Sequence, residues 1–217
     1  DASFYLVRVT APAALTLVAS GVEIARERAG QEQVVIFAAG PMRDFYLAAG
    51  EGLEPVSTTV GQTTVRSYAH PARRAGSELA LETAAKALAI FSTRFGLYPY
   101  SEFEVVSTPM RALGIEYPGM TGIALALYEA DAEVLGAPAN VVLESTVAHE
   151  VGHQWFYNLV GNDEIDAPWL DESLVQYITG LYYRDAYNTS AEASYRASWD
   201  SRWARIDREA IPIGRPS

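Results

Sequence analysis

Residues 149 to 153 read His-Glu-Val-Gly-His, and this pentapeptide constrains the chain more than any other feature. Two histidines four positions apart on a helix project from the same face, so both imidazole rings can bind one metal ion. The glutamate between them can reach a water molecule bound to that ion. The spacing therefore predicts a helix with a catalytic zinc site, in which His149 and His153 are ligands and Glu150 is the general base. The alternative is a pair of surface histidines on an ordinary helix.

The helix that carries this motif can be outlined from its neighbours. Pro138 and Asn140 predict where it starts, and Gly161-Asn162 predicts where it ends. Apolar residues at helical spacing provide a core-facing stripe: Val142, Val147, Val151, Phe156 and Leu159. We therefore expect the motif to lie in the middle of a helix, on rigid backbone.

The third ligand is expected to be a carboxylate. A catalytic zinc needs three protein ligands and one open position, but the only other histidine, His70, lies far upstream. One class of zinc peptidases places a third histidine shortly after the motif. That class is excluded, because it requires glycine and histidine where this chain has Phe156 and Leu159.

Acidic residues follow the motif closely: Asp163, Glu164, Asp166, Asp171 and Glu172. Glu172 is the best candidate for the third ligand, because Pro168 looks like a first-turn proline and places Glu172 inside a second helix. The alternative for Glu172 is a solvated first-turn acid favoured by the helix dipole. Asp171 could orient a zinc-bound imidazole from behind, or it could be an exposed helix acid.

Three motifs together resemble the zinc aminopeptidase family of aminopeptidase N, which belongs to the gluzincin metallopeptidases. The first is His149 to Asn158, which reads His-Glu-Val-Gly-His-Gln-Trp-Phe-Tyr-Asn. The second is Glu172, nineteen residues after His153, and the third is the upstream segment Gly-Ile-Glu-Tyr-Pro-Gly-Met at residues 114–120. The three match the family in order and spacing.

The upstream segment has a defined role in that family. It usually reads Gly-x-Met-Glu-Asn on an edge strand, and its glutamate binds the free amino group of the substrate. The resemblance therefore implies that Glu116 binds the substrate. The chain departs from the pattern at Ile115 and Tyr117, where methionine and asparagine are usual, and keeps the carboxylate.

The resemblance implies aminopeptidase chemistry with one zinc ion and a peptide with a free N-terminus as the partner. Zinc held by His149, His153 and Glu172 polarises the scissile carbonyl and lowers the pKa of its bound water. Glu150 accepts the proton and passes it to the leaving amine. An ammonium buried against Glu116 is worth more than a neutral contact, so a free amino terminus would be preferred over an internal segment.

The family also uses a tyrosine to stabilise the oxyanion of the tetrahedral intermediate. It lies farther past the ligand glutamate than residue 217, whereas Tyr182, Tyr183, Tyr187 and Tyr195 stand too early and look like helix-packing aromatics. Losing an oxyanion donor costs about two to three orders of magnitude in turnover. We therefore expect sequence beyond both ends, and low activity for this stretch alone.

The predicted fold class is α+β, with two parts that meet near residue 70. Residues 1–70 alternate short runs of Val, Thr and aromatics with turn residues, which predicts an all-β section resembling the C-terminal part of the family's β-sandwich-like N-terminal domain. Residues 71–217 are expected to form a thermolysin-like zinc peptidase domain, a small mixed sheet plus helices, truncated at its C-terminal end.

Several elements of the second part can be placed. A helix from about Ser77 to Gly96 carries the apolar stripe Leu81, Ala85, Leu88, Phe91 and Phe95. Strands are expected at residues 103–107 and 121–127, with the Glu116 segment between them. A last helix from about Ser190 carries Tyr195, Trp199, Trp203 and Ile206, which are expected to be core rather than a substrate platform.

Charge and composition exclude several classes of partner. The net charge of -11 argues against nucleic acid and anionic membrane, which need clustered basic residues, and the pair Arg73-Arg74 is too small a patch. No apolar run approaches the length of a membrane span. The absence of cysteine removes disulfides and thiolate zinc sites.

Two alternative functions stay open. The first is a zinc endopeptidase or another zinc hydrolase, for which an amine-binding Glu116 would be pointless. The second is a catalytically incompetent fragment that binds peptide termini or folds around a structural metal. The intact Glu150 speaks against the second, because a structural site has no use for a general base.

Overall fold

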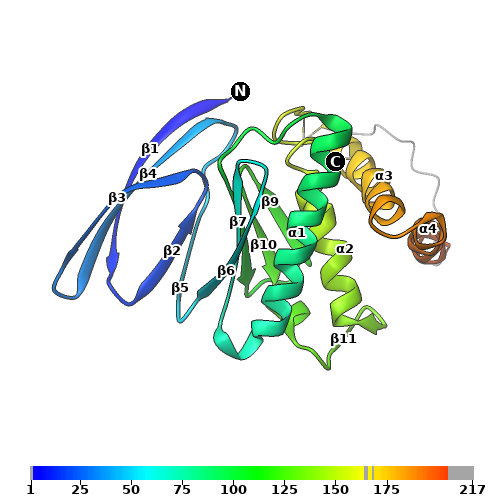
Figure 1. The fold of residues 1–217 in the computed structure, drawn as a ribbon, viewed down its shortest axis with the longest axis horizontal. Coiled ribbons are helices and arrows are strands. Elements are labelled where there is room, and N and C mark those ends of the chain that lie inside the picture. The colour runs from blue at the N-terminus through cyan, green and yellow to red at the C-terminus, as the bar shows by residue number, and fades with distance from the viewer. Residues whose placement is uncertain (1, 164–165, 168, 205–217) are drawn as a thin grey trace.

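The computed structural model describes residues 2–163, 166–167 and 169–204, which form a mixed α/β fold (Figure 1). The strands are β1 (Ser3–Pro12), β2 (Leu15–Ala19), β3 (Val22–Ala29), β4 (Glu32–Met42), β5 (Leu47–Glu51), β6 (Glu54–Val60), β7 (Thr63–Ala69), β8 (Glu102–Thr108), β9 (Gly114–Tyr117), β10 (Met120–Ala124), β11 (Glu133–Val134) and β12 (Ala137–Pro138). The helices are α1 (Arg74–Phe95), α2 (Ala139–Gly152), α3 (Trp169–Ala186) and α4 (Thr189–Trp203), with short 3-10 turns η1 (Pro71–Arg73) and η2 (Leu125–Tyr128).

The N-terminal strands form an antiparallel three-stranded sheet, in the order β1-β4-β3, and a separate pair, β2-β5. Side chains alternate along β4, so that Val35 and Phe37 point inward between half-exposed neighbours. They pack with Leu17 and Ala19 of β2 into a small core. This alternation is the reason that one face of the sheet is apolar.

A five-stranded sheet lies between these strands and the helices. Its order is β6-β7-β8-β10-β9, with β7, β8 and β10 parallel to one another and β6 and β9 antiparallel at the edges. One face packs against α1 and α2, and Val106 and Met120 on the opposite face pack against Val18 of β2. Since β6 and β7 precede residue 70, this sheet runs across the boundary expected there.

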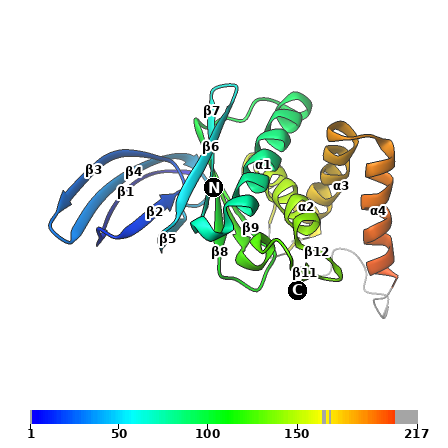
Figure 2. The same ribbon diagram turned by 60° about the horizontal axis from the view of Figure 1, so that its bottom comes forward.

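Helices α1 and α2 both lie on the sheet, and α3 and then α4 lie beyond α2 (Figure 2). The predicted end of α1 at Gly96 is confirmed, and glycine suits the positive φ of 105° there. The predicted stripe is confirmed at Leu88 and Phe91, and Leu81 packs against the core while partly exposed. The stripe also includes Ala80, Ala84 and Ala87, which were not predicted and are fully buried. Small side chains on this face let α1 approach the sheet and α2 closely.

Two expected elements are shorter than predicted. The strand expected at residues 121–127 ends at Ala124 and continues as η2. The motif helix α2 ends at Gly152, with His153 as its C-cap, so the motif lies at the end of the helix rather than in its middle. Residues 153–162 instead form a turn closed by backbone bonds, such as Asn158 N to His153 O at 3.0 Å.

The last helix, α4, starts one residue before the predicted position. Its aromatics are not all core, because Trp199 is 41% exposed. The expectation of a buried Trp199 was therefore wrong, because its side chain lines a cavity between the helices instead. Pro168, Glu164, Ile206 and the side chain of Trp203 lie outside the described residues. Among the described helices, none combines the length and apolar character required to cross a membrane.

Candidate metal centre

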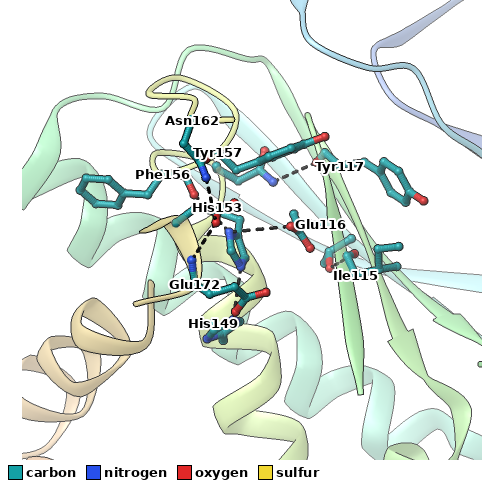
Figure 3. A network of polar contacts seen from close by, with 12 residues as sticks. Ile115, Glu116, Tyr117, His149, His153, Phe156, Tyr157, Asn162 and Glu172 are labelled. Atoms are coloured by element: carbon teal, nitrogen blue, oxygen red, sulfur yellow. Dashed lines mark hydrogen bonds and ion pairs between the residues drawn. The ribbon is translucent and has the colours of Figure 1, made fainter. Parts of the chain in front are cut away.

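The three predicted ligands come together from three backbone positions. His149 lies in the last turn of α2, His153 lies one residue past its end, and Glu172 lies in the first turn of α3. Figure 3 shows the side chains facing one another, with Glu116 approaching His153 from β9. The three ligand atoms all lie within 4.8 Å of one another. Glu172 is exposed, as the solvated-acid alternative held, but its carboxylate faces His149 rather than pointing away from the motif.

The separations suit a tetrahedral cation. Nε2 of His149 lies 3.2 Å from Nε2 of His153 and 3.2 Å from Oε2 of Glu172. Zinc holds nitrogen and oxygen ligands at about 2.0–2.1 Å in a tetrahedral arrangement, which separates two of them by about 3.3 Å. Two neutral imidazoles and one carboxylate are also the ligand set that zinc accepts in catalytic sites. The residues present therefore fit a zinc ion.

The backbone fixes which nitrogen of His153 is available. Nδ1 lies 3.1 Å from the carbonyl oxygen of Phe156, which only accepts, so the ring proton belongs on Nδ1 and the lone pair on Nε2. Burial and the neighbouring His149 lower the pKa of His153 to about 4. The hydrogen bond from His149 holds the pKa of Glu172 below its usual value. Both groups are therefore in their ligating form at neutral pH.

Glu150 is buried beside the ligands. Its Oε2 has no hydrogen-bond partner among the described residues, which is an unusual state for a buried carboxylate. Burial raises its pKa well above the usual value, and the nearby Glu116 and Glu172 raise it further. A buried, unsatisfied oxygen with a raised pKa is suited to accept a proton from a reacting group.

Glu116 lies on β9, which pairs only with β10 in the described part of the chain and therefore forms the edge of the sheet. Its Oε1 is 3.9 Å from Nδ1 of His153. Together with Glu150 and His153 it forms a second group of close ligand-type atoms. The structure thus places the predicted amine-binding carboxylate beside the predicted metal ligands.

Sequence reasoning missed Gln154, which joins these two parts of the site. Its Oε1 accepts from the backbone N of Gly119 at 2.9 Å, and its Nε2 donates to the carbonyl oxygen of Tyr117 at 2.9 Å. Gln154 is fully buried. A glutamine directly after the motif is a signal that could have been used, because a buried amide must find partners for both of its ends.

Other candidate residues have structural roles. Asp171 is buried, so the exposed-acid alternative is wrong; it accepts from Asn162 Nδ2 at 3.3 Å and from the backbone N of Glu172 at 3.0 Å. Asp163 accepts from the backbone N of Asp166. The third histidine, His70, caps η1 by accepting from the backbone N of Ala72.

The hydroxyls of the four tyrosines considered above all have protein partners, and that of Tyr183 bonds the side chain of Ser145. Tyr182 and Tyr187 both donate to Glu144, at 2.8 and 2.6 Å, and Tyr195 accepts from Gln176. Tyr182 packs between helices as predicted, whereas Tyr187 is 52% exposed. These contacts agree with the view that none of the four is placed as an oxyanion donor.

A cavity of about 950 Å³ opens beside the cluster. Its walls come from α2, α3 and α4 and include both charged and aromatic side chains, among them His149, Glu150, Glu172, Tyr183, Tyr195 and Trp199. A volume in this range accommodates several amino-acid residues. The site can therefore be reached by a ligand larger than water.

Residues 79–216 match the peptidase family M1 domain. Relatives include aminopeptidase 2 of Candida albicans, 28% identical over 155 residues, which cover 69% of this chain and 17% of the relative. Aminopeptidase M1-A of Oryza sativa subsp. japonica is 30% identical over 176 residues, which cover 76% of this chain and 20% of the relative. The chain thus spans about a fifth of the length of these relatives.

The fold is similar to that of an M1 zinc metallopeptidase from Deinococcus radiodurans. A crystal structure of that protein superposes with a TM-score of 0.73 at 24% identity, covering 99% of this chain and 47% of the other. A second crystal structure, of a mutant of the same enzyme, gives a TM-score of 0.74 at 22% identity. At these identities the likeness concerns the fold.

Proposed function

The chain belongs to peptidase family M1, and on that premise we propose that it is the catalytic region of a zinc-dependent aminopeptidase. The resemblance to the aminopeptidase N family rests on the same stretch of sequence that the family match covers. The observation that carries the proposal is the convergence of His149, His153 and Glu172, with Glu150 and Glu116 directly beside them. The relatives named aminopeptidases support the same activity.

The residues have separate tasks in this proposal. His149, His153 and Glu172 hold one zinc ion, which when bound supplies Lewis acidity to a carbonyl oxygen and makes water more acidic. Glu150 takes a proton from the attacking water and gives it to the leaving amine. Burial raises its pKa above that of an ordinary carboxyl, which makes it a stronger proton acceptor than an exposed glutamate.

Glu116 and the edge of the sheet define the substrate. An extended peptide can add to the free edge of β9, while the carboxylate of Glu116 receives its ammonium group. A charged terminus paired in this way sets the register of the peptide, so cleavage falls after the first residue. This arrangement favours an aminopeptidase over an endopeptidase.

The proposal extends to the organisation of the chain. Residues 71–217 form part of a thermolysin-like peptidase domain, and residues 1–70 the C-terminal part of a β domain. The mixed sheet with helices on one face and strands on the other supports this division, although β6 and β7 join the catalytic sheet.

Metal content tests the proposal most directly. Wild-type protein prepared without chelators should contain about one zinc per chain by elemental analysis, and Glu172→Ala should lose most of it. Glu82→Ala, on the exposed face of α1, is the matched control and should keep its zinc. Wild-type protein without zinc, or equal zinc in Glu172→Ala, would overturn the ligand assignment.

Activity tests the mechanism separately. Glu150→Gln should keep its zinc and lose hydrolysis of aminoacyl substrates by about 10²–10⁴-fold, the usual contribution of a general base. If hydrolysis by the protein that carries this chain survives the change, Glu150 is not the base.

A further inference from the structure

The turn that joins the two ligand-bearing helices is held from outside by the connection between β4 and β5. Arg43, which directly follows β4, donates from Nη1 to the carbonyl oxygen of Tyr157 at 2.8 Å and from Nη2 to that of Asn162 at 3.3 Å. Its guanidinium also lies over the ring of Tyr157, 4.9 Å from the centroid. The next residue, Asp44, accepts a hydrogen bond from the hydroxyl of Tyr157. Two adjacent residues thus fix the turn of residues 153–162 at three points.

The turn is shaped for this contact. A Cβ atom at Gly161 would lie 2.5 Å from Nη1 of Arg43, so a larger residue there would push the guanidinium out of this position. Tyr157 has a φ of 147°, which residues other than glycine rarely adopt. Such a conformation persists only where the surroundings hold it, and the buried Tyr157 ring is held by Arg43 and Asp44.

Both sides of the metal centre depend on this turn. On one side, His153 donates from Nδ1 to the carbonyl oxygen of Phe156, next to Tyr157, and the rings of His153 and Tyr157 meet edge to face at 6.4 Å. On the other side, Asn162 donates to Asp171, which accepts from the backbone N of Glu172. Tyr157 and Asn162, which both bind Arg43, therefore each contact a residue of the metal centre. Tyr157 contacts the ring of His153, and Asn162 binds Asp171, which precedes Glu172.

We propose that Arg43 and Asp44 are positioning residues of the metal centre, which orient His153 and Glu172 through the turn of residues 153–162. The inference rests on the proposed function, because it concerns the same three ligands. His149 lies within α2 and needs no such support. Residues that orient metal ligands from outside the coordination sphere typically change metal affinity by about 10–100-fold when replaced. The connection between β4 and β5 is thus a component of the site.

Zinc affinity measured by competition with a chelator tests the inference. Arg43→Met removes the guanidinium and should weaken zinc binding by about tenfold or more. Arg28→Met, on the exposed part of β3, is the matched control and should leave the affinity unchanged. Arg43→Lys keeps the charge but not the planar fork, so it should fall between wild type and Arg43→Met. A folded Arg43→Met with wild-type zinc affinity would overturn the positioning role.

A milder variant covers the case in which Arg43→Met does not fold. Tyr157→Phe removes only the hydroxyl that binds Asp44 and keeps the ring under Arg43. It should weaken zinc binding by several-fold, whereas Tyr128→Phe, which removes a buried hydroxyl on η2 far from this turn in the sequence, is the control and should not. Equal affinity for wild type and Tyr157→Phe would contradict the role given to Asp44.

A second readout does not require zinc. In the zinc-free protein, nitrogen NMR of the His153 ring should show the proton on Nδ1, as the contact with Phe156 requires. Arg43→Met should release the turn and give a mixture of tautomers, and Arg28→Met should not. An unchanged His153 tautomer in Arg43→Met would overturn the inference, whether or not the wild-type protein binds zinc. A wild-type protein that binds no zinc would count against the proposed function instead.

Discussion

Gly114 and Glu150 meet so closely that a Cβ atom at position 114 would lie 2.2 Å from Oε1 of Glu150. Gly114 begins β9, the edge strand that carries Glu116, and Glu150 lies in the last turn of α2. The proposed general base is therefore packed directly against the strand that is proposed to bind the substrate. This contact explains why glycine stands at the start of the upstream motif in this chain.

Gly114→Ala should displace the carboxylate of Glu150 and leave the metal ligands in place. A misplacement of about 1 Å at a reacting group can cost about 100-fold in rate. We expect kcat/KM to fall by about that factor while the zinc content stays the same. Gly180→Ala in α3, where the nearest atom would be 3.6 Å from the new Cβ, is the control. Full activity in Gly114→Ala would mean that Glu150 has room to move without loss of function.

Glu116→Ala should separate substrates by their N-terminus. The variant loses the partner of the ammonium group, so KM for substrates with a free amine should rise far more than KM for their N-acetylated analogues. Steady-state kinetics on matched pairs of substrates measures this. Glu27→Ala, on the exposed part of β3, should affect neither. Equal effects of Glu116→Ala on both substrate types would rule out the aminopeptidase assignment and favour an endopeptidase.

The raised pKa of Glu150 predicts a pH dependence of stability in zinc-free protein. A carboxyl whose pKa is higher in the folded state binds its proton more tightly there than in the unfolded chain. Its contribution to stability is complete below the unfolded pKa of about 4.3 and is lost as pH rises through the folded value. At neutral pH, the folded state is therefore destabilised by the free energy needed to bury the charged carboxylate of Glu150.

Glu150→Gln removes this titration. In the presence of a chelator, the free energy of unfolding of wild type relative to Glu150→Gln should fall as pH rises from about 4.5 to about 8. Urea unfolding at several pH values measures the difference. The control is Glu51→Gln, which changes an exposed glutamate. The free energy of unfolding of wild type relative to Glu51→Gln should not fall in this way. Parallel pH profiles for wild type and Glu150→Gln would show that the folded pKa is not raised.

Gln154→Ala should destabilise the joint between α2 and the β9 segment. The change leaves the backbone N of Gly119 and the carbonyl oxygen of Tyr117 buried without their partner. Unsatisfied buried groups cost about 1–3 kcal/mol each, so we expect a loss of about 2–4 kcal/mol in the free energy of unfolding. Gln31→Ala, at an exposed turn, is the control. A loss as small as that of Gln31→Ala would mean that water replaces the amide.

The parts of the site that were predictable from sequence depend on short-range geometry. His149, Glu150 and His153 share one helical turn, and a helix brings residues four apart to one face whatever surrounds it. Glu172 was found in the same way, from its place in the first turn of the following helix. The end of α1 at Gly96 was also a local property, because glycine accepts a φ that other residues avoid.

What sequence patterns could not decide depends on contacts between distant parts of the chain. The apolar spacing continues through Phe156 and Leu159, so nothing local indicated that α2 ends at Gly152. The turn that follows α2 is held by Arg43, which lies more than a hundred residues earlier in the sequence. The space for the Glu150 side chain depends on Gly114 at the start of β9. These contacts result from the packing of the helices against the sheet, and the hydrophobic periodicity of the sequence does not indicate them. Helix geometry and the spacing of the motifs thus predicted the ligand residues, whereas only tertiary packing determined what surrounds them and supports their positions.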